Sequence, residues 1–188
     1  MIPDLLIEYQ EYSPPPVAAD HIHSIWAFRV AADADTVAHT VWPDACASIV
    51  FPSVGPYALF MGAETGPRAT PVHRASVTWG IRAWVDAAAV FGHTCVGMRG
   101  IVSLAPHFDR LGMRLRASPQ HGELLLREWC ETQAESWHTP DPIVRATANY
   151  IIAHSHRVRL TDIAAHVSLG RHKPRTERGR VDRSTRTK

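Results

Sequence analysis

Three tryptophans and one arginine have the side chains best suited to recognise a small molecule. Trp26, Trp42 and Trp79 offer large apolar faces, and Arg82 can donate paired hydrogen bonds to an acceptor. If the tryptophans point inward from different strands, they can line an apolar pocket with a few polar groups. We therefore take these four residues as candidate ligand-binding residues, with ordinary core packing as the competing explanation.

Arg82 also has a purely structural explanation. It can pair with Asp44 or Asp86, or face solvent, while binding of a ligand carboxylate is the remaining alternative. Asp44 follows Pro43 and is well placed to accept backbone N–H bonds at a strand corner. We favour an ion pair that fixes this corner.

The twelve histidines raise the hypothesis of a metal site. His21 and His23 stand two residues apart on an expected strand, so they would face one side, and His39 or His73 could complete a three-ligand site. A carboxylate ligand is not evident, because Asp20 is adjacent and would face the other way. We favour packing or surface roles and expect no bound metal or other cofactor.

The sequence also argues against an enzyme. It has no Gly-rich phosphate loop, HExxH or GxSxG motif. Cys46 and Cys95 have no evident His or acid partner, and with Cys130 they form no CxxC pair, so we expect three inert thiols in a reducing compartment. No run of 18 apolar residues occurs, and the N-terminus lacks a basic n-region. We expect a cytoplasmic protein without a membrane span.

Basic residues concentrate at the C-terminal end. Residues 171–188 hold eight Lys/Arg and two Asp/Glu, whereas acids outnumber bases in the first 170 residues. Such a tail can hold phosphate backbones without sequence preference, or it can be a solvated, disordered end, as we expect for residues 174–188. The candidate DNA contacts here are Arg171, His172, Lys173 and Arg175.

Five short β-branched and aromatic runs separated by Gly, Pro and Ser predict strands in the first half of the chain. They span residues 21–30, 38–44, 45–54, 57–64 and 73–84. The segment 64–71 is Gly/Pro-rich and predicts a turn, and Gly80 predicts a bulge or bend. Strands at this spacing favour a β-barrel or sandwich.

Helical patterns follow in the second half. Residues 85–92 are short and helix-prone, 119–136 form an amphipathic helix with Leu124, Leu125 and Trp129 on its apolar stripe, and 143–157 form another helix. The Pro-rich break at 139–142 predicts a domain boundary. The fold class is therefore α+β, with a β-rich domain over 1–138 followed by helices and, over 142–173, the start of a helix-turn-helix.

The segment "RLTDIAAHVSLG", residues 159–170, predicts the start of a helix-turn-helix. Thr161 is a plausible N-cap, which also places it at a DNA-facing helix end. Leu160, Ile163 and Val167 make one apolar face, and Ala164 would let a second helix pack closely. A plain amphipathic helix remains the alternative.

Residues 143–173 resemble the opening of the DNA-binding domain of AraC-type (arabinose-regulator family) transcription factors. The segment "LTDIAAHVSLG" matches the family pattern, with Gly170 where a Ser cap is usual. The resemblance implies a recognition helix with a Leu and a Phe in its core, but these positions fall at Pro174 and Glu177. We expect a truncated or frame-shifted domain, because Pro in a helix interior costs about 3 kcal/mol.

Two N-terminal segments resemble a β-rich domain found in front of some AraC-type DNA-binding domains. These are "VWPDACASIVF" (41–51) and "WGIRAWVDAAAVFG" (79–92). The resemblance implies a cupin-like domain for sensing or dimerisation. We therefore expect a transcriptional regulator, impaired in DNA binding, with a small-molecule effector and a homodimer as partners. The alternative is a cupin-like small-molecule- or metal-binding protein without a regulatory role.

Overall fold

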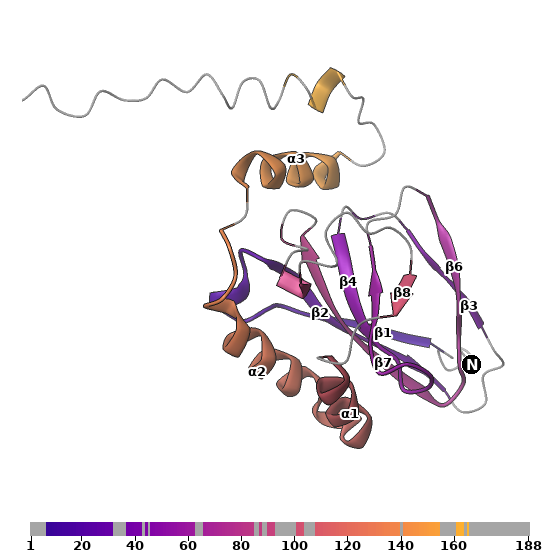
Figure 1. Ribbon diagram of the computed structural model, residues 1–188. Helices are drawn as coiled ribbons and strands as arrows, with labels where there is room; N and C mark the ends of the chain where they lie inside the picture. Colours follow the sequence, from indigo (N-terminus) through magenta and orange to yellow (C-terminus); the bar gives the residue numbers. More distant parts are fainter. Residues whose placement is uncertain are drawn as a thin grey trace, which may run out of the picture.

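The structure is a computed structural model in which the described residues are 7–31, 37–42, 44, 46–62, 66–84, 87, 90–92, 101–103, 108–139, 141–154, 161–163 and 165. Strands come first and helices follow, which confirms the α+β class (Figure 1). The strands are β1 (Ile7–Tyr12), β2 (Ile22–Val30), β3 (Val37–Val41), β4 (Cys46–Phe51), β5 (Leu59–Met61), β6 (Arg68–Val72), β7 (Ser76–Trp84) and β8 (Ile101–Ser103). The α-helices are α1 (Asp109–Ala117), α2 (Gly122–Ala134) and α3 (Pro142–Ala153).

The described strands form an open antiparallel sheet and a separate strand pair. The larger sheet has the order β1-β2-β7-β4-β5-β8, and β3 pairs with β6. The expected barrel is not closed, because β1 and β8 remain as edges of the larger sheet. Figure 1 shows α1 and α2 on one side of this sheet and the β3–β6 pair toward the other.

Three strands lie where the sequence predicted none. β6 occupies much of the segment 64–71, which the Gly and Pro content had marked as a turn. Pro71 is compatible with this strand because β6 pairs with β3 in a sheet of only two strands, where a missing N–H can face away from the partner. β1 and β8 were the other two strands missed.

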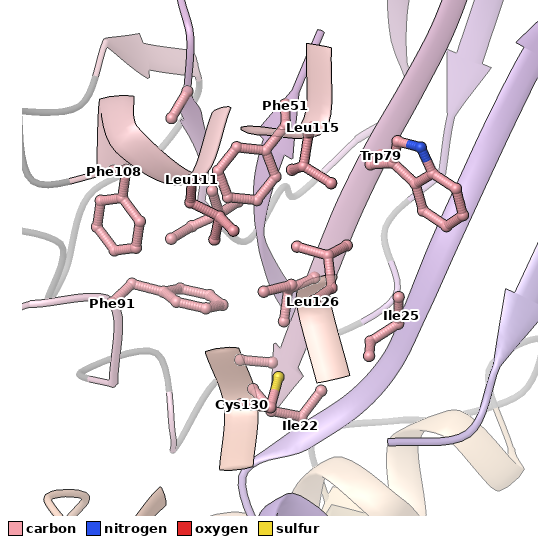
Figure 2. Packing of buried hydrophobic residues seen from close by; sticks show 14 of the residues in the cluster. Ile22, Ile25, Phe51, Trp79, Phe91, Phe108, Leu111, Leu115, Leu126 and Cys130 are labelled. Atoms are coloured by element: carbon pink, nitrogen blue, oxygen red, sulfur yellow. The ribbon is translucent and has the colours of Figure 1, made fainter. Parts of the chain in front are cut away.

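The face of the sheet toward the helices carries the main core. On β7, Trp79, Ile81 and Ala83 point to this face and are almost fully buried. α1 and α2 cover them with a set of buried side chains drawn in Figure 2, which includes Leu111, Leu115, Leu126 and Cys130. Burial of these apolar groups holds the two helices against the sheet.

The apolar stripe of α2 differs from the expected one. Gly122, Leu126, Cys130 and Ala134 are buried and recur every four residues, as one face of a helix requires. Leu124, which we expected on the stripe, is 66% exposed. Leu125 and Trp129 are partly buried and pack against the core as expected, so periodicity indicated the helix correctly and misplaced only Leu124.

Helix α3 begins at the predicted break and is capped by a residue within it. The Asp141 carboxylate accepts hydrogen bonds from the backbone N–H groups of Ile143 and Val144, and Pro142 occupies the first turn. Beyond α3, residues 161–163 and 165 are helical, whereas the residues that would show whether this helix begins at Thr161 lie outside the described ones. Among the described helices, none has both the length and the apolar character needed to cross a membrane.

Candidate ligand-binding site

A cavity lies between the second face of the larger sheet and the β3–β6 pair. Its volume is about 130 Å³. Most of its walls are apolar or aromatic side chains from six strands. The principal ones are Trp26, Phe28, Val41, Val50, Met61 and Val72.

Strand pairing explains how Trp26 reaches the cavity. Trp26 lies opposite Gly80, which in turn lies opposite Val50, so all three share one face of the sheet. A Cβ on Gly80 would stand 2.2 Å from carbon atoms of the Trp26 indole. Gly80 therefore serves close ring packing rather than the bulge we expected, and the register shift lies in β2 between Ile22 and Ser24.

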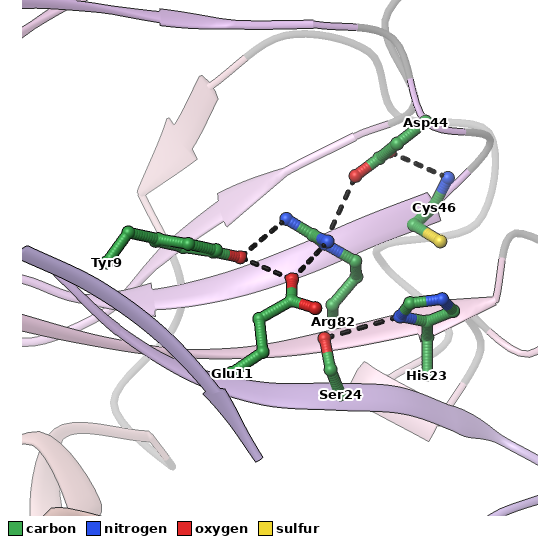
Figure 3. Close-up of polar contacts among 7 residues, drawn as sticks. All are labelled: Tyr9, Glu11, His23, Ser24, Asp44, Cys46 and Arg82. Atoms are coloured by element: carbon green, nitrogen blue, oxygen red, sulfur yellow. Dashed lines mark hydrogen bonds and ion pairs between the residues drawn. The ribbon is translucent and has the colours of Figure 1, made fainter. Parts of the chain in front are cut away.

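Arg82 organises a polar cluster at one end of the cavity (Figure 3). Its Nη1 lies 2.7 Å from Oε1 of Glu11, and its Nε lies 3.1 Å from Oδ2 of Asp44. Its Nη2 donates to the Tyr9 hydroxyl, which donates to Glu11. The Oδ1 atom of Asp44 accepts the Cys46 N–H at 3.0 Å. These contacts confirm the expected ion pair and the expected acceptor at the strand corner.

Tyr9 and Glu11 were not among the sequence candidates. Both stand on β1, and because that strand was not expected, nothing in the sequence placed them beside Arg82. Glu11 lies directly opposite Trp26 in the β1–β2 register. A strand prediction for residues 7–12 would have put an acid on the cavity face.

Burial raises the pKa values of two groups in this cluster. Desolvation, strengthened by the hydrogen bond to Glu11, raises the pKa of Tyr9 well above its usual range. Desolvation and the nearby Asp44 carboxylate raise the pKa of the Cys46 thiol to about 12. Both groups are therefore neutral at physiological pH.

Cys46 and Cys130 are expected to resist alkylation in the folded protein. Both are buried, and burial raises the pKa of each thiol to about 12, so the reactive thiolate is scarce. Iodoacetamide labelling at about pH 8, followed by peptide mass spectrometry, should modify either site at least about 100-fold more slowly in native than in urea-unfolded protein. Rapid labelling of either residue under native conditions would contradict this description of the two sites.

The structure separates the four predicted ligand-binding residues. Trp26, Trp42 and Arg82 line the cavity, with Trp42 68% exposed. Trp79 lies on the opposite face of the sheet, is 2% exposed, and donates from Nε1 to the Pro119 carbonyl. Trp79 and Arg82 stand three residues apart on β7, and side chains at this spacing face opposite sides of a strand. The expectation that all three tryptophans share one pocket is therefore corrected.

The histidines that the structure describes are dispersed rather than clustered. The register shift between Ile22 and Ser24 breaks the alternation that would have put His21 and His23 on one side. Nε2 of His21 lies 2.7 Å from the His138 carbonyl oxygen, away from His39, which lines the cavity. Within the described parts of the chain, no three His, Cys, Asp or Glu side chains are grouped as metal ligands would be.

Two of these histidines should make the free energy of unfolding depend on pH. Burial, with the positive charge of Arg82, lowers the pKa of His23, and burial lowers that of His39. The unfolded chain therefore binds these protons more readily, so the free energy of unfolding should fall as the pH drops below about 6.5. Urea titrations of the double variant His23→Gln/His39→Gln should show a flatter decline. The prediction would be contradicted if the free energy of unfolding of the double variant fell with pH as steeply as that of the wild type. It would also be contradicted if replacing the exposed His121 with Gln flattened the decline equally.

The predicted DNA contacts are only partly described. Thr161 is exposed and helical. Arg171, His172, Lys173 and Arg175 lie outside the described residues, as do the expected turn at 168–170 and the tail. The proposed recognition segment therefore remains a prediction.

Comparisons of the chain with protein-family models, curated proteins and solved structures found no match.

Proposed function

We propose that the chain is an AraC-type transcriptional regulator whose cavity between the two sheets binds a small effector. The observation that carries this proposal is the Asp44–Arg82 ion pair at the cavity. Each residue comes from one of the two segments, 41–51 and 79–92, on which the resemblance to an AraC-type sensor domain rests. A concave, mostly apolar site with a few polar groups is the usual form of a small-molecule site.

Helix α3 offers a physical connection between the cavity and the proposed DNA-reading segment. The Arg145 guanidinium lies 4.9 Å from the Trp84 ring centroid and donates to the Asp20 carbonyl. Trp84 pairs across the sheet with Cys46, whose side chain lines the cavity. A ligand that shifts the cavity wall would thereby change how α3 is held.

The DNA-reading function itself is proposed to be impaired. Arg171, His172, Lys173 and Arg175 keep the charge that phosphate contacts need. Pro174 and Glu177, however, stand where a recognition helix would need apolar core residues. Specific binding should therefore be weak or absent, leaving salt-sensitive binding to any duplex.

A fluorescence-anisotropy titration of labelled duplex DNA tests this proposal. The expected result is binding at about 50 mM salt that is lost at about 150 mM and shows no sequence preference. Replacing Arg171, Lys173 and Arg175 by Gln should lower the slope of log K against log salt by about 3, if each residue neutralises one phosphate. The same change at Arg110, Arg114 and Arg127 is the charge-matched control and should leave the slope nearly unchanged.

Two outcomes would overturn the regulator proposal in different ways. Tight binding to one site at about 150 mM salt with competitor present would show an intact reader. No DNA binding at any salt would favour the alternative, a cupin-like small-molecule-binding protein without a regulatory role.

A further inference from the structure

We propose that the ligand of this cavity is an uncharged, single-ring aromatic compound that carries a hydrogen-bond acceptor, such as a phenol or an aryl ketone. The inference rests on the proposed function only in taking the cavity as the effector site. Its grounds are the size of the cavity, the charge of its walls and two buried polar atoms that have no hydrogen-bond partner among the described residues.

The dimensions and walls of the cavity suit one aromatic ring. Its volume of about 130 Å³ is close to that of apolar protein cavities of ~150 Å³ that bind benzene. Trp26 and Phe28 on β2 and Trp42 after β3 supply aromatic surfaces against which a planar ring can stack. Val50 and Val72 add branched aliphatic surface beside these rings.

The charges in the wall cancel one another. Asp44 and Arg82 are the charged side chains among the described lining residues, and they are paired with each other. His39 also lines the cavity, but burial lowers its pKa, so it is neutral at pH 7. Arg82 also contacts Glu11 and Tyr9, so a carboxylate ligand would compete with two acids for one guanidinium. Both Asp44 oxygens are engaged, by Cys46 N–H and by Arg82, so the acid in the cavity lining has no oxygen free for an organic cation.

Two polar atoms in the wall lack partners among the described residues. Nε1 of Trp26 and Oγ1 of Thr70 are both buried without a hydrogen bond. An indole N–H is only a donor, and because this one is buried against Gly80, a ligand acceptor can satisfy it only when the ring turns toward the cavity. Buried donors left unpaired are costly, and a ligand oxygen would remove that cost.

Isothermal titration with four probes of similar size tests the proposed class. Acetophenone is neutral with an acceptor, ethylbenzene lacks the acceptor, benzoate is an anion and benzylammonium a cation. We expect acetophenone to bind at least about 10-fold more tightly than each of the other three, since one unmet buried hydrogen bond is worth about that factor.

Two variants test whether the ligand contacts the Trp26 indole. Trp26→Phe keeps a ring but removes the N–H, and should reduce the affinity for acetophenone to near that for ethylbenzene while leaving ethylbenzene nearly unchanged. Gly80→Ala should displace the Trp26 indole into the cavity and weaken both probes about 10-fold or more, since its Cβ would stand 2.2 Å from that ring. Trp137→Phe, outside the cavity lining, is the control and should change neither affinity.

The outcomes separate this inference from the regulator proposal. Preferential binding of benzoate or benzylammonium, or equal binding of ethylbenzene and acetophenone, would overturn the ligand class and leave effector sensing intact. Failure of all four probes to bind would overturn the inference. The DNA titration is independent of all these results, so loss of DNA binding would overturn only the regulator proposal.

Discussion

Gly122→Ala is expected to lower the free energy of unfolding by about 3 kcal/mol, the upper end of typical overpacking costs. A Cβ at this position would stand 2.0 Å from the Trp79 indole. That ring is 2% exposed and is fixed by the hydrogen bond from its Nε1 to the Pro119 carbonyl, so it has little room to move. Either α2 must lift from the sheet or the indole must leave its position.

Urea denaturation of the two proteins measures this effect. Gly122 has helical backbone angles, with φ at −60°, so an alanine there fits the backbone and the cost is steric. The matched control is Gly66→Ala, where a Cβ meets no atom within 4 Å, and its stability should change by less than about 1 kcal/mol. Equal stability of the two variants would show that α2 and Trp79 do not pack as described.

Arg82→Met is expected to cost about 2 kcal/mol. The substitution leaves Glu11 and Asp44 facing each other across the site without their shared counter-charge. Removing one partner of a fully buried pair costs ~3–5 kcal/mol, and the partial exposure of this cluster reduces the figure. The Arg82 side chain is 21% exposed and each acid 39%.

A surface ion pair provides the control for this prediction. Arg114 lies 2.9 Å from Glu128 with both side chains more than half exposed, so Arg114→Met should change stability by less than about 0.5 kcal/mol. Adding Asp44→Asn to Arg82→Met should recover part of the loss, because one unpaired charge is removed. Equal effects of the two methionine variants, or no recovery, would argue against a shared charge cluster at Arg82.

The strands with strong β-branched and aromatic composition were predictable from sequence. β2, β4 and β7 fall within the expected runs, because their side chains are buried and the composition reflects it. β1 was not, since four of its six residues are exposed and it carries two acids. β6 was missed because the Gly and Pro content of its segment predicts a turn, although these residues are also compatible with a strand in a two-stranded sheet.

The candidate site was predictable only where residue type and local turn chemistry favour a contact. The Asp44 corner and its pairing with Arg82 follow from residue type and turn chemistry. The separation of Trp79 from Trp26 depends on register across strands, which a single strand pattern does not reveal. His21 and His23 were placed together wrongly because a β-bulge interrupts the alternation on which that inference relied.

Site-resolved ¹⁹F NMR of protein labelled with 5-fluorotryptophan tests most directly whether the cavity is a ligand site. The six tryptophans divide into cavity residues and residues elsewhere in the fold. Titration with acetophenone should shift the resonances of Trp26 and Trp42 and leave those of Trp79, Trp129 and Trp137 unchanged. Shifts centred on the latter three, with Trp26 and Trp42 unaffected, would contradict the assignment of the ligand site to this cavity.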